Sequence, residues 1–326
     1  MSTETIGGIS RSIEPATRAF LEKINALKGP RLYEMSVEDA RKTLSNVQAI
    51  DVPKKPVDVE DRTIPGGPMG QVRIKIVRPK GSTGTLPVVV YFHGGGWILG
   101  DYAVFERLIG DLAHGANAAI VFVDYTRSPE AKYPVAIEED YTATKYVADH
   151  GKDLNMDTSR LAVAGDSVGG NMTAIVSMLA KQRGGPNISY QVLFYPVTDA
   201  NFNTGSYNQL ATGHWLTGEA MKWFWDNYLP DKQERRNPMA SPLGATVDQL
   251  KGLPPALVIT NEYDVLRDEG EAYARKLMDA GVRTTGVRFL GTIHDMVMLN
   301  ALANTPSAQG AIDLACDMLR KAFAKK

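Results

Sequence analysis

The sequence predicts an α/β fold in which helices cover both faces of a mostly parallel sheet. Three observations predict it: apolar segments with the length of buried strands, helical periodicity between them, and one segment with the pattern of strand, tight turn and helix. Strands that alternate with helices form right-handed β-α-β units, so these strands are expected to run parallel. The predicted strands are residues 86–93, 118–125, 161–165, 190–196, 256–260 and 284–290, and helical patterns occur at 103–115, 135–150 and 269–281.

The first 80 residues precede this alternation. Residues 16–27 and 36–47 have apolar side chains at helical spacing, which predicts two amphipathic helices outside the sheet. Residues 59–64 and 72–77 then flank the glycine-rich turn PGGPMG, which predicts an antiparallel hairpin. The hairpin brings the predicted sheet to eight strands.

One long interval in the second half of the chain interrupts the alternation of strands and helices. Residues 198–254 are polar and aromatic and contain a single strong helix pattern at 216–229. An insertion of this size between two core strands is more typical of a functional lid than of a structureless loop. We therefore predict one domain over residues 1–326, with this insertion as a lid.

Composition narrows the possible partners and compartments. The net charge is -1 and no long basic run is present, which argues against nucleic acid or an anionic membrane surface as a partner. Cys316 is the only cysteine, so an intrachain disulfide or a cysteine metal site is excluded, and its helical pattern predicts a core position. Residues 1–12 lack an apolar signal core and no apolar run has membrane-spanning length, which predicts a cytoplasmic protein.

Ser167 lies at the turn between the strand LAVAG and the following helix. GDSVG fits the pattern G-x-S-x-G, in which Gly165 and Gly169 remove the β-carbons that would clash in a tight strand-to-helix turn. Such a turn exposes the serine hydroxyl and aims the helix N-terminus at an oxyanion forming beside it. A serine between small residues is otherwise most often a turn or cap residue. Here the strand before it and the helix after it favour a nucleophile instead.

A second chemical motif, HGGGW at 93–97, directly follows a predicted strand. Three successive glycines let the backbone approach a ligand closely and present N–H groups to an oxyanion. His93 precedes the serine in the chain, so it is expected to orient its neighbours by hydrogen bonding rather than to act as the base.

A serine nucleophile needs a base and a carboxylate, which follow it in the order acid, then histidine, in this kind of fold. Of the two histidines after Ser167, His294 follows a predicted strand and is preferred over His214, which lies in the insertion. Asp264 follows the strand 256–260 and is the preferred acid. Its rivals are Asp268, which fits better as a helix N-terminal residue, and Glu262.

Together these motifs resemble those of the hormone-sensitive-lipase family of bacterial α/β-hydrolase esterases, over nearly the whole chain. The resemblance implies the triad Ser167, Asp264 and His294 and an oxyanion hole made by the N–H groups of Gly95, Gly96 and Val168. It also implies a helical cap formed by about 1–50 and about 200–250. Trp97 and Trp215 are predicted to contact the substrate. The matching segments are residues 93–97, VDY with PE and YP within 123–134, 165–170, 263–270 and His294.

The chain departs from the family pattern at several positions. Val168 replaces the usual alanine and narrows the space beside the nucleophile, while Arg127 and Ser128 replace Leu-Ala. Asp295 and Met296 follow the histidine where Gly-Phe is common, and a carboxylate there either alters the titration of His294 or faces water.

These residues predict a carboxylesterase for short to medium acyl chains that uses an acyl-enzyme mechanism, without a metal or organic cofactor. The expected partner is a small ester substrate, and a homodimer is possible. An amidase, thioesterase, peptidase or deacetylase with the same triad is the alternative, and a non-catalytic small-molecule receptor on the same fold is a weaker one.

Overall fold

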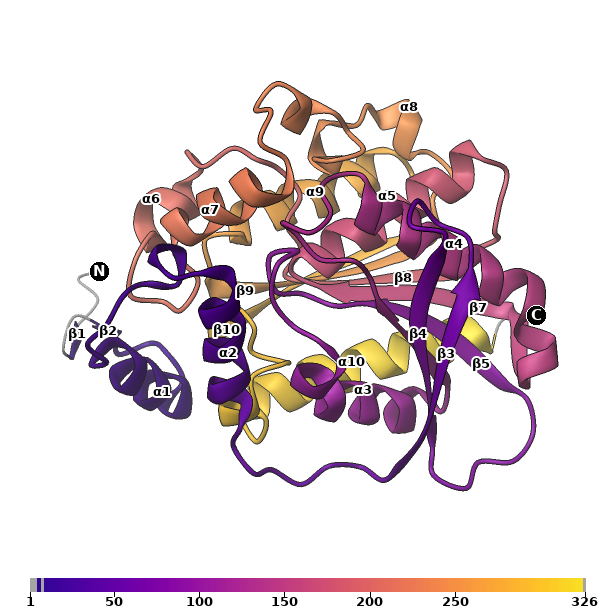
Figure 1. The fold of residues 1–326 in the computed structure, drawn as a ribbon. Helices are drawn as coiled ribbons and strands as arrows, with labels where there is room; N and C mark the ends of the chain where they lie inside the picture. Colours follow the sequence, from indigo (N-terminus) through magenta and orange to yellow (C-terminus); the bar gives the residue numbers. More distant parts are fainter. Residues whose placement is uncertain (1–4, 7–8, 325–326) are drawn as a thin grey trace.

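An eight-stranded sheet runs through the centre of the protein (Figure 1). The computed structural model describes residues 5–6 and 9–324. The spatial order of the strands is β10-β9-β8-β7-β5-β6-β4-β3, and only the pairs that β4 makes with β3 and β6 are antiparallel. The predicted mostly parallel sheet of eight strands is confirmed. The strands are β3 (Val57–Pro65), β4 (Gln71–Pro79), β5 (Leu86–Phe92), β6 (Ala119–Asp124), β7 (Met156–Asp166), β8 (Tyr190–Phe194), β9 (Ala256–Tyr263) and β10 (Thr284–Ile293).

The central strands are apolar on both faces because both faces are covered. Every residue of β5 and β8 is buried, as expected for parallel strands between two helical layers. Strand β7 begins at Met156, five residues before the predicted start at Leu161. Its first residues, MDTSR, are mostly polar, and its pairing with β5 shifts register between Pro87 and Val88. Because the first part of β7 is polar and pairs irregularly, a run of apolar residues does not predict it.

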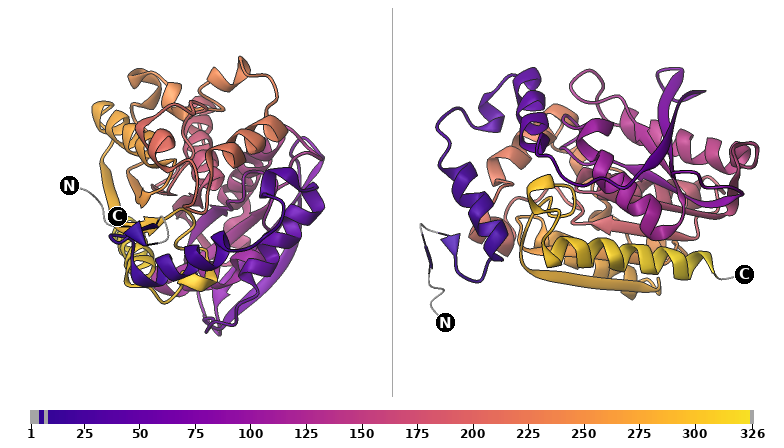
Figure 2. Two further views of the ribbon diagram at one scale, coloured as in Figure 1. Left: turned by 90° about the vertical axis from the view of Figure 1, so that its left-hand side faces the viewer. Right: turned by 90° about the horizontal axis from the view of Figure 1, so that it is seen from below.

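Helices form two layers around the sheet (Figures 1 and 2). One face is covered by α3 (Tyr102–Ala116) and α10 (Pro306–Phe323), which pack against each other. The other face is covered by α4 (Val135–His150), α5 (Val168–Gln182) and α9 (Arg267–Asp279). Cys316 of α10 is buried, which confirms its predicted core position.

Helices from two distant parts of the chain meet at one end of the sheet. Here α1 (Pro15–Asn25) and α2 (Val37–Gln48) lie beside α6 (Gly205–Leu210) and α7 (Gly218–Tyr228) (Figures 1 and 2). The ring of Phe20 packs on Trp215 with centroids 5.4 Å apart, and the Asn25 side chain donates a hydrogen bond of 3.0 Å to the Gly213 carbonyl. The remaining elements are β1 (Thr5–Ile6), β2 (Ile9–Ser10), α8 (Val247–Leu250), and the short 3₁₀ turns η1 (Leu32–Glu34), η2 (Gly151–Leu154), η3 (Glu234–Arg236), η4 (Pro242–Gly244) and η5 (Asn300–Leu302).

The end of α2 is anchored to the core by one buried side chain. Gln48 donates hydrogen bonds of 2.8 Å to the carbonyls of Val104 and Met298, and its amide oxygen accepts the N–H of Asn300. A buried amide is stabilising only when its donors and acceptors are paired, as here. The N-terminal helices are thus attached to the segment that follows β10.

Candidate active site

Ser167 occupies the turn between β7 and α5 in a strained conformation. Its φ of 56° lies in the left-handed region that side chains other than glycine rarely adopt. The turn closes because two glycines allow backbone to touch backbone. A β-carbon on Gly169 would lie 1.9 Å from the Phe92 carbonyl oxygen, and one on Gly165 would lie 2.3 Å from the Gly169 carbonyl oxygen. The Ser167 N–H donates to the Phe194 carbonyl at 2.9 Å, which holds the turn against β8.

The loops after β9 and β10 bring Asp264 and His294 to this serine. Nε2 of His294 lies 3.0 Å from the Ser167 hydroxyl, and Nδ1 lies 2.7 Å from Oδ2 of Asp264. The other Asp264 oxygen accepts the N–H of Leu266 at 2.9 Å, which orients the carboxylate. A carboxylate can only accept, so Nδ1 carries a proton and Nε2 of the neutral ring can accept the serine proton.

Three carboxylates lie around the imidazole of His294, those of the buried Asp264 and Asp166 and of the partly buried Asp295. Burial alone would lower the pKa of His294, but the charges of Asp264 and Asp295 outweigh it and raise the pKa to about 9. Burial raises the pKa of Asp166, with help from the charge of Asp295, to about 7. The surroundings therefore favour the imidazolium form, which is the form that a base acquires during the reaction.

The rival side chains have other partners. Asp268 lies in the first turn of α9, where its carboxylate accepts the N–H of Ser206 at 2.7 Å, and Glu262 accepts the N–H of Gly291 at 2.7 Å. His214 lies in the insertion, where its ring stacks on Tyr263. Ser167 therefore meets His294 and not these alternatives.

The glycine loop 94–96 lies beside the serine turn. Gly95 and Gly96 have φ of 101° and 63°, and a β-carbon on Gly96 would lie 2.1 Å from the ring of Phe224 in α7. Asp166 connects this loop to the turn, because its Oδ1 accepts the Gly94 N–H at 3.0 Å. In the described part of the chain, the N–H groups of Gly95, Gly96 and Val168 make no hydrogen bond. Free N–H groups beside a nucleophile are what an oxyanion requires.

Sequence reasoning overlooked Asp166. Besides Gly94, its carboxylate accepts the Tyr91 hydroxyl at 2.7 Å, so one buried acid ties β5, the glycine loop and the nucleophile turn together. Its position could have predicted this role: an acid at the end of an apolar strand is buried, and a buried carboxylate needs hydrogen-bond partners.

His93 is an orienting residue in the structure. Its Nδ1–H donates to the Gly94 carbonyl at 2.7 Å, and its ring stacks on Tyr125 at 4.2 Å. Burial lowers the pKa of His93 to about 3, so the ring stays neutral and supports the glycine loop without charge.

The two tryptophans predicted to contact substrate have different surroundings. Trp97 is fully buried and stacks on Tyr228 of α7 at 4.0 Å. Trp215 is half-buried, and its indole N–H donates to Asp295 at 2.8 Å. A substrate contact for either ring stays a prediction. Of the other departures, Arg127 donates to the Gly100 carbonyl and Met296 is buried.

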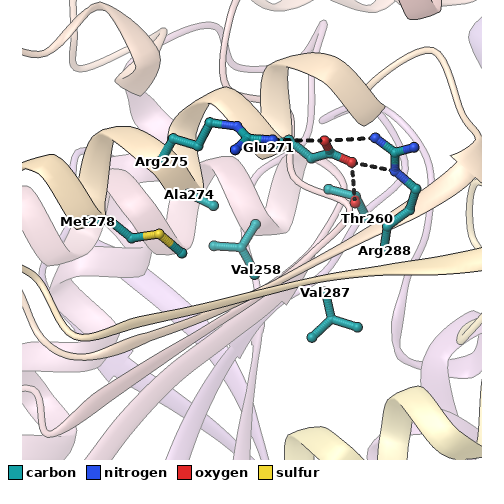
Figure 3. Close-up of a pocket in the computed structure, with 9 residues that line it drawn as sticks. Val258, Thr260, Glu271, Ala274, Arg275, Met278, Val287 and Arg288 are labelled. Carbon is teal, nitrogen blue, oxygen red and sulfur yellow. Dashed lines mark hydrogen bonds and ion pairs between the residues drawn. The ribbon is translucent and has the colours of Figure 1, made fainter.

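A separate pocket of about 300 Å³ lies between α9 and the strands β9 and β10 (Figure 3). Glu271 sits in its wall, paired with Arg288 at 2.6 Å and accepting from Thr260 at 3.3 Å. None of the residues that line this pocket belongs to the group around Ser167. Within residues 5–6 and 9–324, each helix is too short or too polar to span a lipid bilayer. No three or more His, Cys, Asp or Glu side chains of the same residues are grouped so that they could hold a metal ion.

Comparison with known proteins gives consistent matches over most of the chain. Residues 89–298 match a family described as the alpha/beta hydrolase fold. An esterase from Pseudomonas putida of known structure is 50% identical, with a TM-score of 0.95, over 97% of this chain and 99% of that one. An esterase of Gibberella moniliformis is 32% identical over 96% of this chain and 98% of its own length. The carboxylic ester hydrolase LipN of Mycobacterium tuberculosis is 38% identical over 80% of this chain and 70% of its own length.

Proposed function

This chain belongs to the α/β-hydrolase fold family, in its hormone-sensitive-lipase branch, and we propose that it hydrolyses short to medium acyl esters through Ser167, His294 and Asp264. It is an esterase, a serine hydrolase that acts on carboxylic esters. The observation that carries the residue assignment is the buried hydrogen-bonded chain from the Ser167 hydroxyl through His294 to Asp264.

The mechanism follows from the directions of these hydrogen bonds. His294 takes the proton of Ser167 as the hydroxyl oxygen attacks the ester carbonyl, and Asp264 stabilises the imidazolium that forms. The protonated Nε2 then donates to the leaving alcohol. Water repeats the sequence on the acyl-enzyme and releases the acid. The raised pKa of His294 makes it a strong base once it is neutral, but it leaves only a small neutral fraction at neutral pH and below.

The oxyanion is assigned to the N–H groups of Gly95, Gly96 and Val168. Val168 is the first residue of α5, so the positive end of the helix dipole adds to its N–H. Asp166 links the glycine loop 94–96 to the serine turn, so the N–H donors are already in place and need not rearrange during the reaction.

The triad is tested by Ser167→Ala, His294→Ala and Asp264→Asn, with His214→Ala as the matched control. The first two are expected to lower the turnover of a 4-nitrophenyl ester by several orders of magnitude, about 10⁶ at most, because the residues act as a unit. Asp264→Asn is expected to cost about 10⁴. Circular dichroism must show that each variant is folded. An active His294→Ala together with an inactive His214→Ala would overturn the assignment.

The segments at about 1–50 and about 200–250 are proposed to form the cap over this site. Two contacts support this role: the Phe224 ring faces Gly96 of the oxyanion loop, and Tyr228 stacks on Trp97 at the end of the same loop. Ser167 is 4% exposed beneath them. Substrate therefore enters through or under the cap.

The preference for short to medium chains rests on bulky groups around the nucleophile. Phe224 touches the glycine loop, the ring of Tyr195 packs on His294 with centroids 4.8 Å apart, and Val168 is wholly buried. Each methylene buried in the pocket contributes about 0.8 kcal/mol, so kcat/KM should rise over the first few carbons and then fall. The test is a series of 4-nitrophenyl esters from two to sixteen carbons. A maximum at about four to eight carbons is expected, whereas a maximum at the long end, with activation on emulsified triglyceride, would contradict the proposal.

A further inference from the structure

Asp295 is a second carboxylate beside the imidazole that Asp264 already orients. Its Oδ1 lies 3.4 Å from Nε2 of His294, the same nitrogen that lies 3.0 Å from the Ser167 hydroxyl. The catalytic nitrogen thus has two oxygen atoms within reach. Only one of them, the hydroxyl, can give the proton that the proposed mechanism requires.

The other oxygen of Asp295 is held by the cap. The indole N–H of Trp215 donates to Oδ2 at 2.8 Å. Both residues have a positive φ, 74° for Trp215 and 66° for Asp295, so each backbone is held in a conformation that side chains rarely adopt. Phe20 of α1 packs on the Trp215 ring from the other cap segment. The backbone is strained at both residues that form this hydrogen bond, which indicates that the surrounding structure holds Trp215 and Asp295 in contact.

We propose that Trp215 is a positioning residue: its indole N–H holds the carboxylate of Asp295 away from Nε2 of His294, so that this nitrogen faces Ser167. The proposal rests on the triad proposed above. It makes the cap part of the catalytic arrangement, because a residue of the insertion then decides which oxygen the histidine meets.

Chemistry explains why the position of Asp295 matters. A carboxylate pairs strongly with a protonated imidazole, so a closer approach of Asp295 to Nε2 would hold the proton there more tightly and leave less of the ring neutral to act as the base. The groups that face His294 are Asp264 from the end of β9, Asp166 from the end of β7, Asp295 from its own loop, and the phenol ring of Tyr195 after β8. All of these are acidic or neutral. Without the indole N–H, Asp295 has His294 as its remaining strong partner.

The test uses Trp215→Phe, Asp295→Asn and the double variant, with kcat/KM measured across pH. Phenylalanine keeps an aromatic ring against Phe20, although a smaller one, and removes the N–H donor. We expect Trp215→Phe to move the acid limb of the profile up by about one pH unit, which lowers kcat/KM at neutral pH about tenfold. Asp295→Asn is expected to move the limb down, because it removes a negative charge beside the base.

The double variant separates positioning from simple packing. With Asp295→Asn already present there is no carboxylate to release, so adding Trp215→Phe is expected to leave the acid limb where Asp295→Asn put it. Trp223→Phe is the matched control, since this cap tryptophan packs on Phe224, and it is expected to leave the limb at its original position.

Two results would overturn the inference. One is a Trp215→Phe variant that loses activity equally at every pH and is not restored by Asp295→Asn, which would make Trp215 a packing residue only. The other is an acid limb that Trp215→Phe does not move. Either result leaves the triad intact if His294→Ala is inactive, whereas an active His294→Ala removes the proposed function itself.

Discussion

Gly169→Ala is expected to inactivate the enzyme through a collision between two backbones. The new β-carbon would lie 1.9 Å from the Phe92 carbonyl oxygen and 2.7 Å from its carbonyl carbon. Contacts under 3.0 Å are essentially never seen for real β-carbons, so α5 and β5 must separate by about 1 Å. Neither partner is a flexible side-chain end, because Phe92 lies in a buried central strand that pairs on both sides.

The cost falls on both stability and catalysis. Overpacking of this kind costs about 1–3 kcal/mol, and the rigid backbone on both sides places the expected loss of unfolding free energy at the upper end. Ser167 lies two residues before Gly169, so a shift of α5 moves the hydroxyl relative to His294. A misplacement of about 1 Å costs about 100-fold in rate.

Gly110→Ala in α3 is the matched control. A β-carbon there would meet its nearest atom, the Lys55 carbonyl oxygen, at 3.5 Å, an ordinary contact. Alanine in a helix interior is expected to raise the free energy of unfolding by about 0.5–1 kcal/mol and to leave activity unchanged. Urea unfolding and hydrolysis of 4-nitrophenyl butyrate measure both effects. A Gly169→Ala enzyme with the original urea midpoint and kcat/KM within about threefold would refute the reasoning.

Three further predictions follow from other parts of the molecule. The base is active only when neutral, so the raised pKa of His294 predicts that kcat/KM climbs through neutral pH with a midpoint at about pH 9 and levels off only above it; an acid limb centred below 6.5, the ordinary value for histidine, would contradict it. Removal of residues 1–45 exposes the partners of Phe20 and Leu21 and is expected to alter substrate preference and cause association while the core stays folded; a monodisperse truncation with unchanged preference argues against this. Gln48→Ala removes the partner of the buried Val104 carbonyl and of the Asn300 N–H, so it is expected to lower the free energy of unfolding by about 1–3 kcal/mol. An unchanged urea midpoint would disprove this.

The fold could be predicted because its elements are local patterns. Buried strands such as 86–93 are uniformly apolar and the helices between them keep their period, so each element is visible in its own residues. The start of β7 was missed because residues 157–160 are polar and this segment joins the sheet only through pairing with β5. Where a segment becomes a strand because it pairs with a neighbouring strand, its own residues need not show a strand pattern.

The same distinction separates the parts of the site. Chain order and strand ends placed Asp264 and His294 near Ser167, although 127 residues separate the serine from the histidine. The bond between Trp215 and Asp295 spans 80 residues and depends on how the insertion docks on the core. No periodicity or motif encodes that docking, so the sequence indicated an unusual Asp295 without its partner.

Because α1 and α2 lie in the N-terminal part of the chain, they are made long before the residues that they contact. Glu14 donates its N–H to the Gly291 carbonyl, and Gln48 binds Asn300. A ribosome adds about 5–20 residues per second, so these helices wait on the order of ten seconds or more before side chains such as Phe20 and Leu21 of α1 are buried. Apolar side chains exposed in this way are the kind of surface that makes a nascent chain prone to association. In the proposed catalytic centre His294 is made last, so a nascent chain that has not reached residue 294 cannot hydrolyse an ester by this route.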